Sequence, residues 1–239
     1  MRFPQPLIEG CLLRRYKRFL ADVQLVGGEV ITAHTANTGA MTGCAEPGSR
    51  VWLSRSDNPR RKYAHTWELV EAVPGVLAGI NTQLSNTLAA EAIAAGCLPG
   101  LDGFSRIRRE VRYGEENSRI DLLLEGGSVT PCHVEVKNVT LVRGGEAFFP
   151  DAVSARASKH LRELEGVVRS GGRGALFFCV QRGDVAAVRP AGDIDPSYGE
   201  ALRRALAAGV EAYAMAGEVT AEGIVLNRPL PVLGAVDRP

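Results

Sequence analysis

The stretch Asn117-Ser-Arg-Ile-Asp-Leu-Leu-Leu-Glu-Gly-Gly-Ser-Val-Thr-Pro-Cys-His-Val-Glu-Val-Lys-Asn138 predicts two strands joined by a turn. Apolar residues alternate with others over residues 120–124 and again over residues 134–136. Between these two runs, residues 125–128 break the pattern with two adjacent glycines, as a hairpin turn does. The stretch therefore predicts a β-hairpin at the centre of the chain.

Three polar residues interrupt these apolar strands. Side chains two apart on a strand share a face, so Glu135 and Lys137 should point the same way. Asp121 lies on the neighbouring strand, within reach of Glu135 if the hairpin pairs in that register. Carboxylates of this kind hold Mg²⁺ together with water and substrate phosphate, and a neighbouring ammonium can orient the attacking water. A surface hairpin carrying a Glu–Lys ion pair would show the same loose spacing.

The pattern Asp121…Glu135-Val136-Lys137 resembles the D…(D/E)-x-K signature of restriction-endonuclease-like nucleases. Further motifs along the chain are Arg18-Phe19, His34-x-x-Asn37-Thr38-Gly39, Asn117-Ser-Arg-Ile-Asp121, Val134-Glu-Val-Lys-Asn-Val139, Lys159-His-Leu161 and Gly209-Val-Glu211. Through these motifs, residues 7–233 resemble the sugar fermentation stimulation protein A family. The resemblance implies an α+β or α/β chain: an N-terminal OB-fold-like β-barrel, residues 1–82, then a restriction-endonuclease-like mixed sheet flanked by helices, residues 83–239.

The same resemblance implies a non-specific DNA-binding protein with a divalent-metal-dependent phosphodiesterase (nuclease) site. Asp121 and Glu135 would bind Mg²⁺ or Mn²⁺, and Lys137 would position the attacking water. A helical Glu ahead of the core sheet often joins this site in the superfamily, so Glu91 is a candidate third ligand; a solvent-facing Glu fits the sequence equally well. The alternative function is a non-catalytic DNA-binding regulatory protein linked to sugar (maltose) metabolism. The complete Asp–Glu–Lys set favours the nuclease.

Composition sets broader bounds. A chain of 239 residues with 45% hydrophobic and 23% charged residues suits one large folded domain or two modest ones. Residues 1–80 contain ten Lys/Arg and seven Asp/Glu, a net +3 that is compatible with a polyanion partner. The five cysteines lack a C-x-x-C pair and predict free buried thiols in a reducing compartment. Because no signal peptide or membrane-spanning apolar run is evident, we expect a cytoplasmic protein.

Short strands separated by turns are predicted at residues 21–26, 30–34, 51–54 and 67–73. Two basic clusters with interleaved aromatic residues lie among them and provide candidate nucleic-acid contacts at Arg14, Arg15, Lys17, Arg18, Arg60, Arg61 and Lys62. The alternative is a solvated barrel rim whose aromatic rings turn inward. Asn37 and Gly39 are expected to form a tight turn with positive φ.

The second half of the chain alternates between strand and helix patterns. Helices are predicted at residues 87–95, 152–169 and 196–208, and strands at residues 107–113, 175–180, 185–188, 210–215 and 223–226, with a loop at 141–150. Ser85 or Asn86 is the expected cap of the first helix. The long middle helix predicts a right-handed crossover between parallel strands. On it, Arg156 and Lys159 are candidate phosphate contacts, unless they simply belong to a polar helix face.

Overall fold

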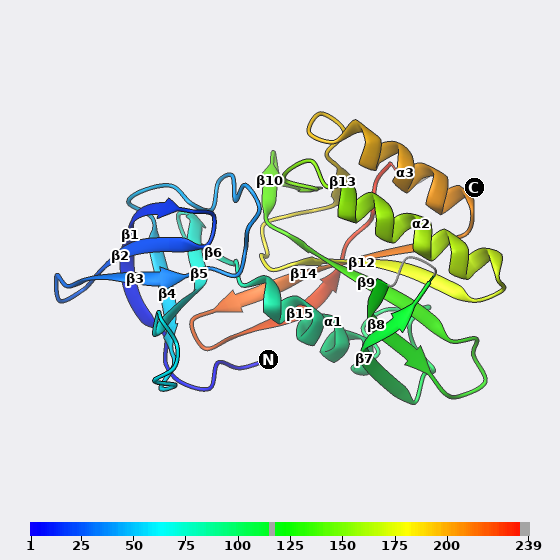
Figure 1. Cartoon of the computed structure of the whole chain (residues 1–239), viewed down its shortest axis with the longest axis horizontal. Coiled ribbons are helices and arrows are strands. Elements are labelled where there is room, and N and C mark those ends of the chain that lie inside the picture. The colour runs from blue at the N-terminus through cyan, green and yellow to red at the C-terminus, as the bar shows by residue number, and fades with distance from the viewer. Residues whose placement is uncertain (115–117, 235–239) are drawn as a thin grey trace.

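The computed structural model describes residues 1–114 and 118–234. A β-barrel lies at one end of the molecule, and a larger part built on a mixed sheet lies at the other (Figure 1). Asn117, at the start of the predicted hairpin, lies outside the described residues.

The barrel sheet consists of β1 (Ile8–Tyr16), β2 (Leu20–Leu25), β3 (Val30–His34), β4 (Arg50–Arg55), β5 (His65–Val73) and β6 (Val76–Gly79). The strands pair in the order β3-β2-β1-β4-β5-β6, and a parallel pairing of β3 with β5 closes the first five into a barrel. Trp67 is fully buried in the barrel core, where its indole N–H donates to the Leu69 carbonyl at 2.9 Å. The predicted barrel is confirmed, although β1 and β6 are absent from the predicted strands.

The larger sheet has the order β15-β14-β12-β9-β8-β7. Its strands are β7 (Arg106–Tyr113), β8 (Ser118–Glu125), β9 (Cys132–Val139), β12 (Arg173–Val180), β14 (Glu211–Thr220) and β15 (Gly223–Pro229). The predicted hairpin is confirmed as the antiparallel pair β8–β9, and β9 and β12 run parallel as predicted. The predicted loop at 141–150 is wrong, because it contains β10 (Leu141–Arg143) and β11 (Glu146–Phe149), which form a small sheet with β13 (Val188–Pro190). Segments of three or four residues are too short to establish a readable alternation.

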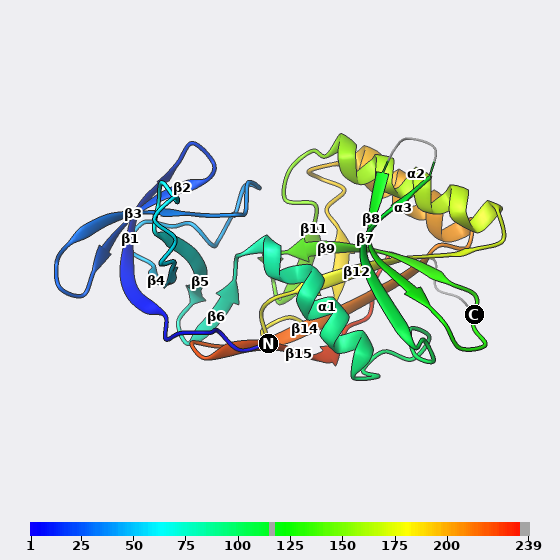
Figure 2. The same cartoon turned by 60° about the horizontal axis from the view of Figure 1, so that its bottom comes forward.

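Helix α1 (Ser85–Ala94) covers one face of the larger sheet, while α2 (Ala155–Arg169) and α3 (Pro196–Ala207) cover the other (Figure 2). Neighbouring residues of β12 show the division, since Leu176 is buried with α2 and α3 and Phe177 with α1. Helix α2 begins after Ser154, which caps it, so the predicted start at residue 152 is wrong and Val153 is 77% exposed. In the described part of the chain, no helix has the length and apolar character needed to cross a membrane.

Two predicted local features differ from the structure. The predicted cap of the first helix, Ser85 or Asn86, is wrong, because both residues lie inside α1. A 3₁₀ turn at Thr82–Leu84 leads into α1, and the cap of this turn is Asn81, whose side chain accepts from the Gln83 N–H at 3.0 Å. Neither Asn37 nor Gly39 has a positive φ. The side chain of Asn37 instead accepts from the Gly39 N–H at 2.9 Å, so the turn is made by a side-chain bond without a left-handed backbone.

The cysteine prediction is largely confirmed. All five thiols are free, and Cys44, Cys132 and Cys179 are buried. Cys11 and Cys97 are only partly buried. Cys97 follows the end of α1, at the rim of the core.

The barrel and the larger sheet share a packed boundary at the end of β6. The Gly79 N–H donates to the Gln181 carbonyl at 2.7 Å, and barrel residues Trp52 and Leu69 join the hydrophobic core beneath α1. The division into domains 1–82 and 83–239 stays a prediction, since this core contains residues from both.

Replacing Gly79 with Ala should destabilise the protein by about 1–3 kcal/mol, because overpacking a tight boundary forces neighbouring groups apart. The added Cβ would lie 2.9 Å from both Gln181 Cβ and Ile224 Cδ1. Gly27→Ala, on a hairpin tip with nothing within 4 Å, is the matched control and should change the unfolding free energy by less than about 0.5 kcal/mol. Denaturant unfolding measures the unfolding free energy of both variants. Equal changes in Gly79→Ala and Gly27→Ala would contradict the prediction.

Candidate active site

Strands β8 and β9 stop pairing at the position of Asp121. Their ladder ends at Leu122 and Val134, although β8 continues to Ser118. Asp121 Oδ2 then accepts from the Val136 N–H at 2.7 Å. A side-chain bond thus replaces a strand–strand bond, and the two strands diverge around the carboxylate.

Asp121 is also held from α1, where Asn86 Nδ2 donates to Asp121 Oδ1 at 2.9 Å. Burial and, after it, the nearby Glu135 carboxylate raise the pKa of Asp121 to about 6. Both hydrogen bonds oppose this rise. The carboxylate is therefore fixed in position but lies where a negative charge is poorly stabilised.

Glu135 lies beside it, buried on β9. Its Oε1 forms a salt bridge with Lys137 Nζ at 2.8 Å and contacts His160 Nδ1, whereas its Oε2 is buried and has no hydrogen-bond partner among the described residues. Burial acts to raise the pKa of Glu135, but the bond from His160 and the charge of Lys137 outweigh it and hold the pKa below its ordinary value. Glu135 is therefore ionised and has one oxygen without a partner.

His160 connects this group to Arg156 on α2. Arg156 Nε donates to His160 Nε2 at 3.4 Å, which leaves the ring proton on Nδ1, facing Glu135. His160 is buried and Arg156 is exposed, so the pair runs from the sheet to the surface.

These side chains surround a cavity of about 330 Å³, which we call the Asp121 cavity. Its lining residues are Thr82, Ser85, Asn86, Asp121, Glu135, Val136, Lys137, Asn138, Arg156 and His160. The structure thus brings together Asp121, Glu135 and Lys137, as the hairpin register requires.

Glu91 does not join them, and its predicted place in the site is corrected. Its carboxylate is ion-paired with the ammonium of Met1 at 2.7 Å, and the side chain is 49% exposed. Glu91 lies five residues after Asn86, the residue of α1 that reaches Asp121. At about 100° per residue, the two side chains point about 140° apart around the helix axis, so Glu91 faces away from Asp121.

The donor set fits a divalent cation. Two carboxylates with an unpartnered buried oxygen supply the hard oxygen ligands that Mg²⁺ and Mn²⁺ prefer, with water and phosphate completing the shell. A cation would also relieve the repulsion that raises the pKa of Asp121. Within residues 1–114 and 118–234, no group of three His, Cys, Asp or Glu is placed to hold a metal, so Asp121 and Glu135 would be the anionic ligands.

Comparisons with known proteins identify the family. A family model described as "Sugar fermentation stimulation protein RE domain" matches residues 83–223, and one described as "SfsA N-terminal OB domain" matches residues 13–80. The chain belongs to the SfsA family. These matches confirm the predicted fold class of an OB barrel followed by a restriction-endonuclease-like domain.

Similar proteins share the whole length of this SfsA-family chain. A sugar fermentation stimulation protein homolog from Thioalkalivibrio sulfidiphilus is 61% identical, covering 97% of this chain and 98% of the relative. A homolog from Geobacter metallireducens is 60% identical, covering 98% and 100%. The solved structure of Pyrococcus furiosus SfsA in complex with Ca²⁺ is 32% identical, covers 97% of both chains and superposes with a TM-score of 0.87.

The first basic cluster of this SfsA chain divides between internal and exposed roles. Arg15 donates to four backbone carbonyl groups at 2.6–3.3 Å, so its guanidinium stabilises the neighbouring loop. Arg14 pairs with Asp22 at 2.8 Å. Lys17 and Arg18 are exposed at the turn between β1 and β2.

The second cluster lies between β4 and β5. Arg61 donates to Thr66 Oγ1 at 2.9 Å, Lys62 lies over the Tyr63 ring at 5.5 Å, and the Arg60 side chain is exposed. None of the seven barrel residues predicted to contact nucleic acid lines the Asp121 cavity.

Of the two candidates on α2, Arg156 lines the Asp121 cavity, and Lys159 is not among its lining residues. Two residues at this cavity were not predicted from the sequence: His160, which contacts Glu135, and Asn86, which donates to Asp121. His160 lies one helical turn after Arg156, and this spacing was the available signal.

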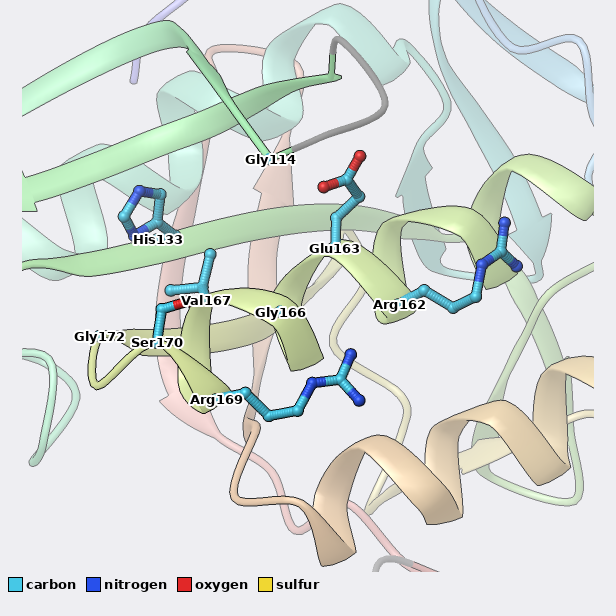
Figure 3. Close-up of a pocket in the computed structure, with 9 residues that line it drawn as sticks. All are labelled: Gly114, His133, Arg162, Glu163, Gly166, Val167, Arg169, Ser170 and Gly172. Atoms are coloured by element: carbon cyan, nitrogen blue, oxygen red, sulfur yellow. The ribbon is translucent and has the colours of Figure 1, made fainter.

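A larger cavity, about 680 Å³, lies beside the C-terminal half of α2 (Figure 3). It is lined by Gly114, His133, Arg162, Glu163, Gly166, Val167, Arg169, Ser170 and Gly172. Glu163 points toward Gly114 and accepts from Ser118 Oγ at 3.2 Å, while the two arginines extend away from His133 (Figure 3). Its polar groups do not converge on one point, unlike those of the Asp121 cavity.

Replacing Asp121 with Asn should stabilise the metal-free protein by about 1–3 kcal/mol at pH 7.5. The folded pKa of Asp121 is about 6, above its ordinary 3.8, so ionising it weakens folding as pH rises from about 4 to 6. The extra unfolding free energy of Asp121→Asn over the parent should therefore be fully present above pH 6 and should vanish near pH 4. Denaturant unfolding at the two pH values tests this, with exposed Asp57→Asn as the control. A variant no more stable than the parent at pH 7.5 would contradict it.

Proposed function

We propose that this chain is a divalent-metal-dependent nuclease whose site is the Asp121 cavity. The observation that carries the proposal is the convergence of Asp121, Glu135 and Lys137 on one cavity, with the buried Glu135 Oε2 left without a partner. The match to a restriction-endonuclease-like domain and the Ca²⁺ complex of the Pyrococcus furiosus relative support it.

Each side chain has a distinct role in this proposal. Bound Mg²⁺ or Mn²⁺ would lower the pKa of a water molecule and neutralise charge on the phosphate. Asp121 and Glu135 hold the cation. Lys137, fixed by its 2.8 Å salt bridge to Glu135, donates hydrogen bonds that orient the attacking water or stabilise the developing phosphate charge.

Arg156 and His160 support the substrate side of the cavity. The Arg156 Nε bond to His160 orients the guanidinium, and because Arg156 is exposed at the cavity, its remaining N–H groups can donate two hydrogen bonds to one phosphate. His160 in turn holds Glu135 through Nδ1. Together they link phosphate binding to the position of a metal ligand.

The substrate in this proposal is DNA bound without sequence preference. The exposed Lys17, Arg18 and Arg60 on the barrel and Arg156 on α2 suit contacts with phosphates, which carry no sequence information.

A non-catalytic DNA-binding regulatory protein is the second candidate. The observation that favours it is the small anionic set: in the described part of the chain, two carboxylates line the cavity and no third carboxylate joins them. A weak metal site of this kind would still allow the barrel to bind DNA.

Replacing Lys137 with Met should lower cleavage of labelled DNA and RNA by about a hundredfold or more, because the side chain keeps its length but loses its charge at the reaction centre. Asp121→Asn should do the same. Cleavage should require Mn²⁺ or Mg²⁺ and stop in EDTA, as judged on gels for single- and double-stranded substrates.

Glu91→Gln is the matched control, because it removes a carboxylate of α1 that lies apart from the cavity, and its cleavage rate should stay within about twofold of the parent. If Glu91→Gln lost as much cleavage activity as Lys137→Met, the loss would be explained by disturbed folding and not by the site. DNA binding without cleavage under every metal condition would favour the regulatory protein.

A further inference from the structure

The turn between β1 and β2 keeps two basic residues in an unfavourable backbone conformation. Lys17 has φ of 49° and Arg18 has φ of 66°, in the left-handed region that glycine and asparagine adopt most easily. A non-glycine residue held there costs on the order of 1–3 kcal/mol, and such residues concentrate at functional sites. The fold thus retains two cations at a tip where glycine would be more stable.

The charges at this tip are available to a ligand. Lys17 is exposed and has no hydrogen-bond or ion-pair partner among residues 1–114 and 118–234. Within the described residues, the Arg18 side chain is bonded through Nε alone, which donates to the Thr38 carbonyl at 3.2 Å and leaves its other N–H groups available. Their neighbour Arg15 differs, since its guanidinium is occupied by backbone carbonyl groups.

An aromatic pair lies directly beside these charges. The Phe19 side chain is 44% exposed, and its ring centroid lies 6.4 Å from that of His34, with 39° between the ring planes. An exposed phenylalanine next to cations is the arrangement on which single-stranded nucleic acids stack a base while their phosphates meet the charges. The bases of a duplex are already stacked on each other and cannot use the ring.

A short backbone path connects this pair to the Asp121 cavity. The Phe19 carbonyl accepts from the Thr35 N–H at 2.9 Å, and the next residue, Ala36, accepts from Thr82 Oγ1 at 3.2 Å. Thr82 lines the Asp121 cavity. The backbone of Phe19 is thereby joined to the wall of the cavity through two hydrogen bonds and one peptide step.

We propose that Lys17, Arg18, Phe19 and His34 form a binding surface for single-stranded nucleic acid, which directs the strand toward the Asp121 cavity. The surface itself stands on the barrel geometry, and only its role in supplying a substrate rests on the proposed nuclease function. Duplex DNA meets the same cations but gains nothing from the ring.

The experiment measures fluorescence anisotropy of a labelled thymidine oligonucleotide, its RNA counterpart and a duplex of equal length, with the full chain in EDTA. Phe19→Ala should weaken single-strand binding by about fivefold to a hundredfold, and duplex binding by less than about twofold. Phe19→Trp should retain single-strand binding. Because Phe19 is exposed, both variants should fold, which circular dichroism can verify.

The charge on Lys17 has its own test. Lys17→Ala should lower the salt dependence of single-strand binding by about 0.7 in log–log slope, the value for one lost phosphate contact. Arg203→Ala removes an exposed positive charge from α3, outside the barrel, and should leave the slope unchanged.

Two results would overturn the proposal: no loss in Phe19→Ala, or an equal loss for single strands and duplex. Since EDTA prevents metal-dependent cleavage, these outcomes do not depend on the nuclease activity. If Phe19→Ala weakens single-strand binding but the protein cleaves no nucleic acid, the binding surface would be supported and only the nuclease proposal would be rejected. The DNA and RNA arms identify which strand the surface prefers.

Discussion

The hydrogen bond from the Val136 N–H to Asp121 determines the shape of the site. It lies where the β8–β9 ladder ends, and it uses a backbone donor that a regular hairpin would pair with a backbone carbonyl. Because the carboxylate satisfies this donor, the strands can diverge without leaving it unpaired in a buried position. The divergence opens the Asp121 cavity and leaves Glu135 and Lys137 facing it. One side chain therefore provides both the opening and a carboxylate oxygen at the cavity.

The barrel is connected to this site by buried polar groups as well as by the chain. Gln181 Nε2 donates to Asn138 Oδ1 at 2.7 Å at the cavity and contacts the Asn81 carbonyl at 3.3 Å. Asn81 Nδ2 donates to Glu68 of the barrel at 2.8 Å. Buried polar networks specify one arrangement of their members, because any shift leaves desolvated groups unpaired. A nucleic acid on the barrel would thus meet a cavity held at a defined position relative to it.

The sequence allowed the central hairpin to be predicted, because both strands and their turn lie within one short stretch. Asp121, Glu135 and Lys137 could be brought together if the strands paired in one particular register, which the structure has. Asn86 and His160 could not, since they reach the site from α1 and α2, and their positions depend on which helix face packs on the sheet. Glu91 was assigned wrongly for the same reason: its helix was predicted, but the rotation of that helix was not. Strand β1 was missed because its paired apolar and basic residues do not alternate.

The basic clusters show why a count of charges in the sequence does not locate a binding surface. Arg14, Arg15, Lys17 and Arg18 are equivalent in a composition-based argument, yet the fold pairs the first with Asp22 and uses the second to hold a loop. An arginine whose donors are occupied by carbonyl groups must break those bonds to bind a phosphate, so it adds little affinity. Only cations that the fold leaves unpaired contribute fully. In this barrel Lys17 is such a cation, at the strained turn beside Phe19. The Arg15 guanidinium holds that turn by donating to the Arg18 carbonyl at 2.6 Å, so the arginine that is lost to phosphate binding keeps the neighbouring lysine in place for it.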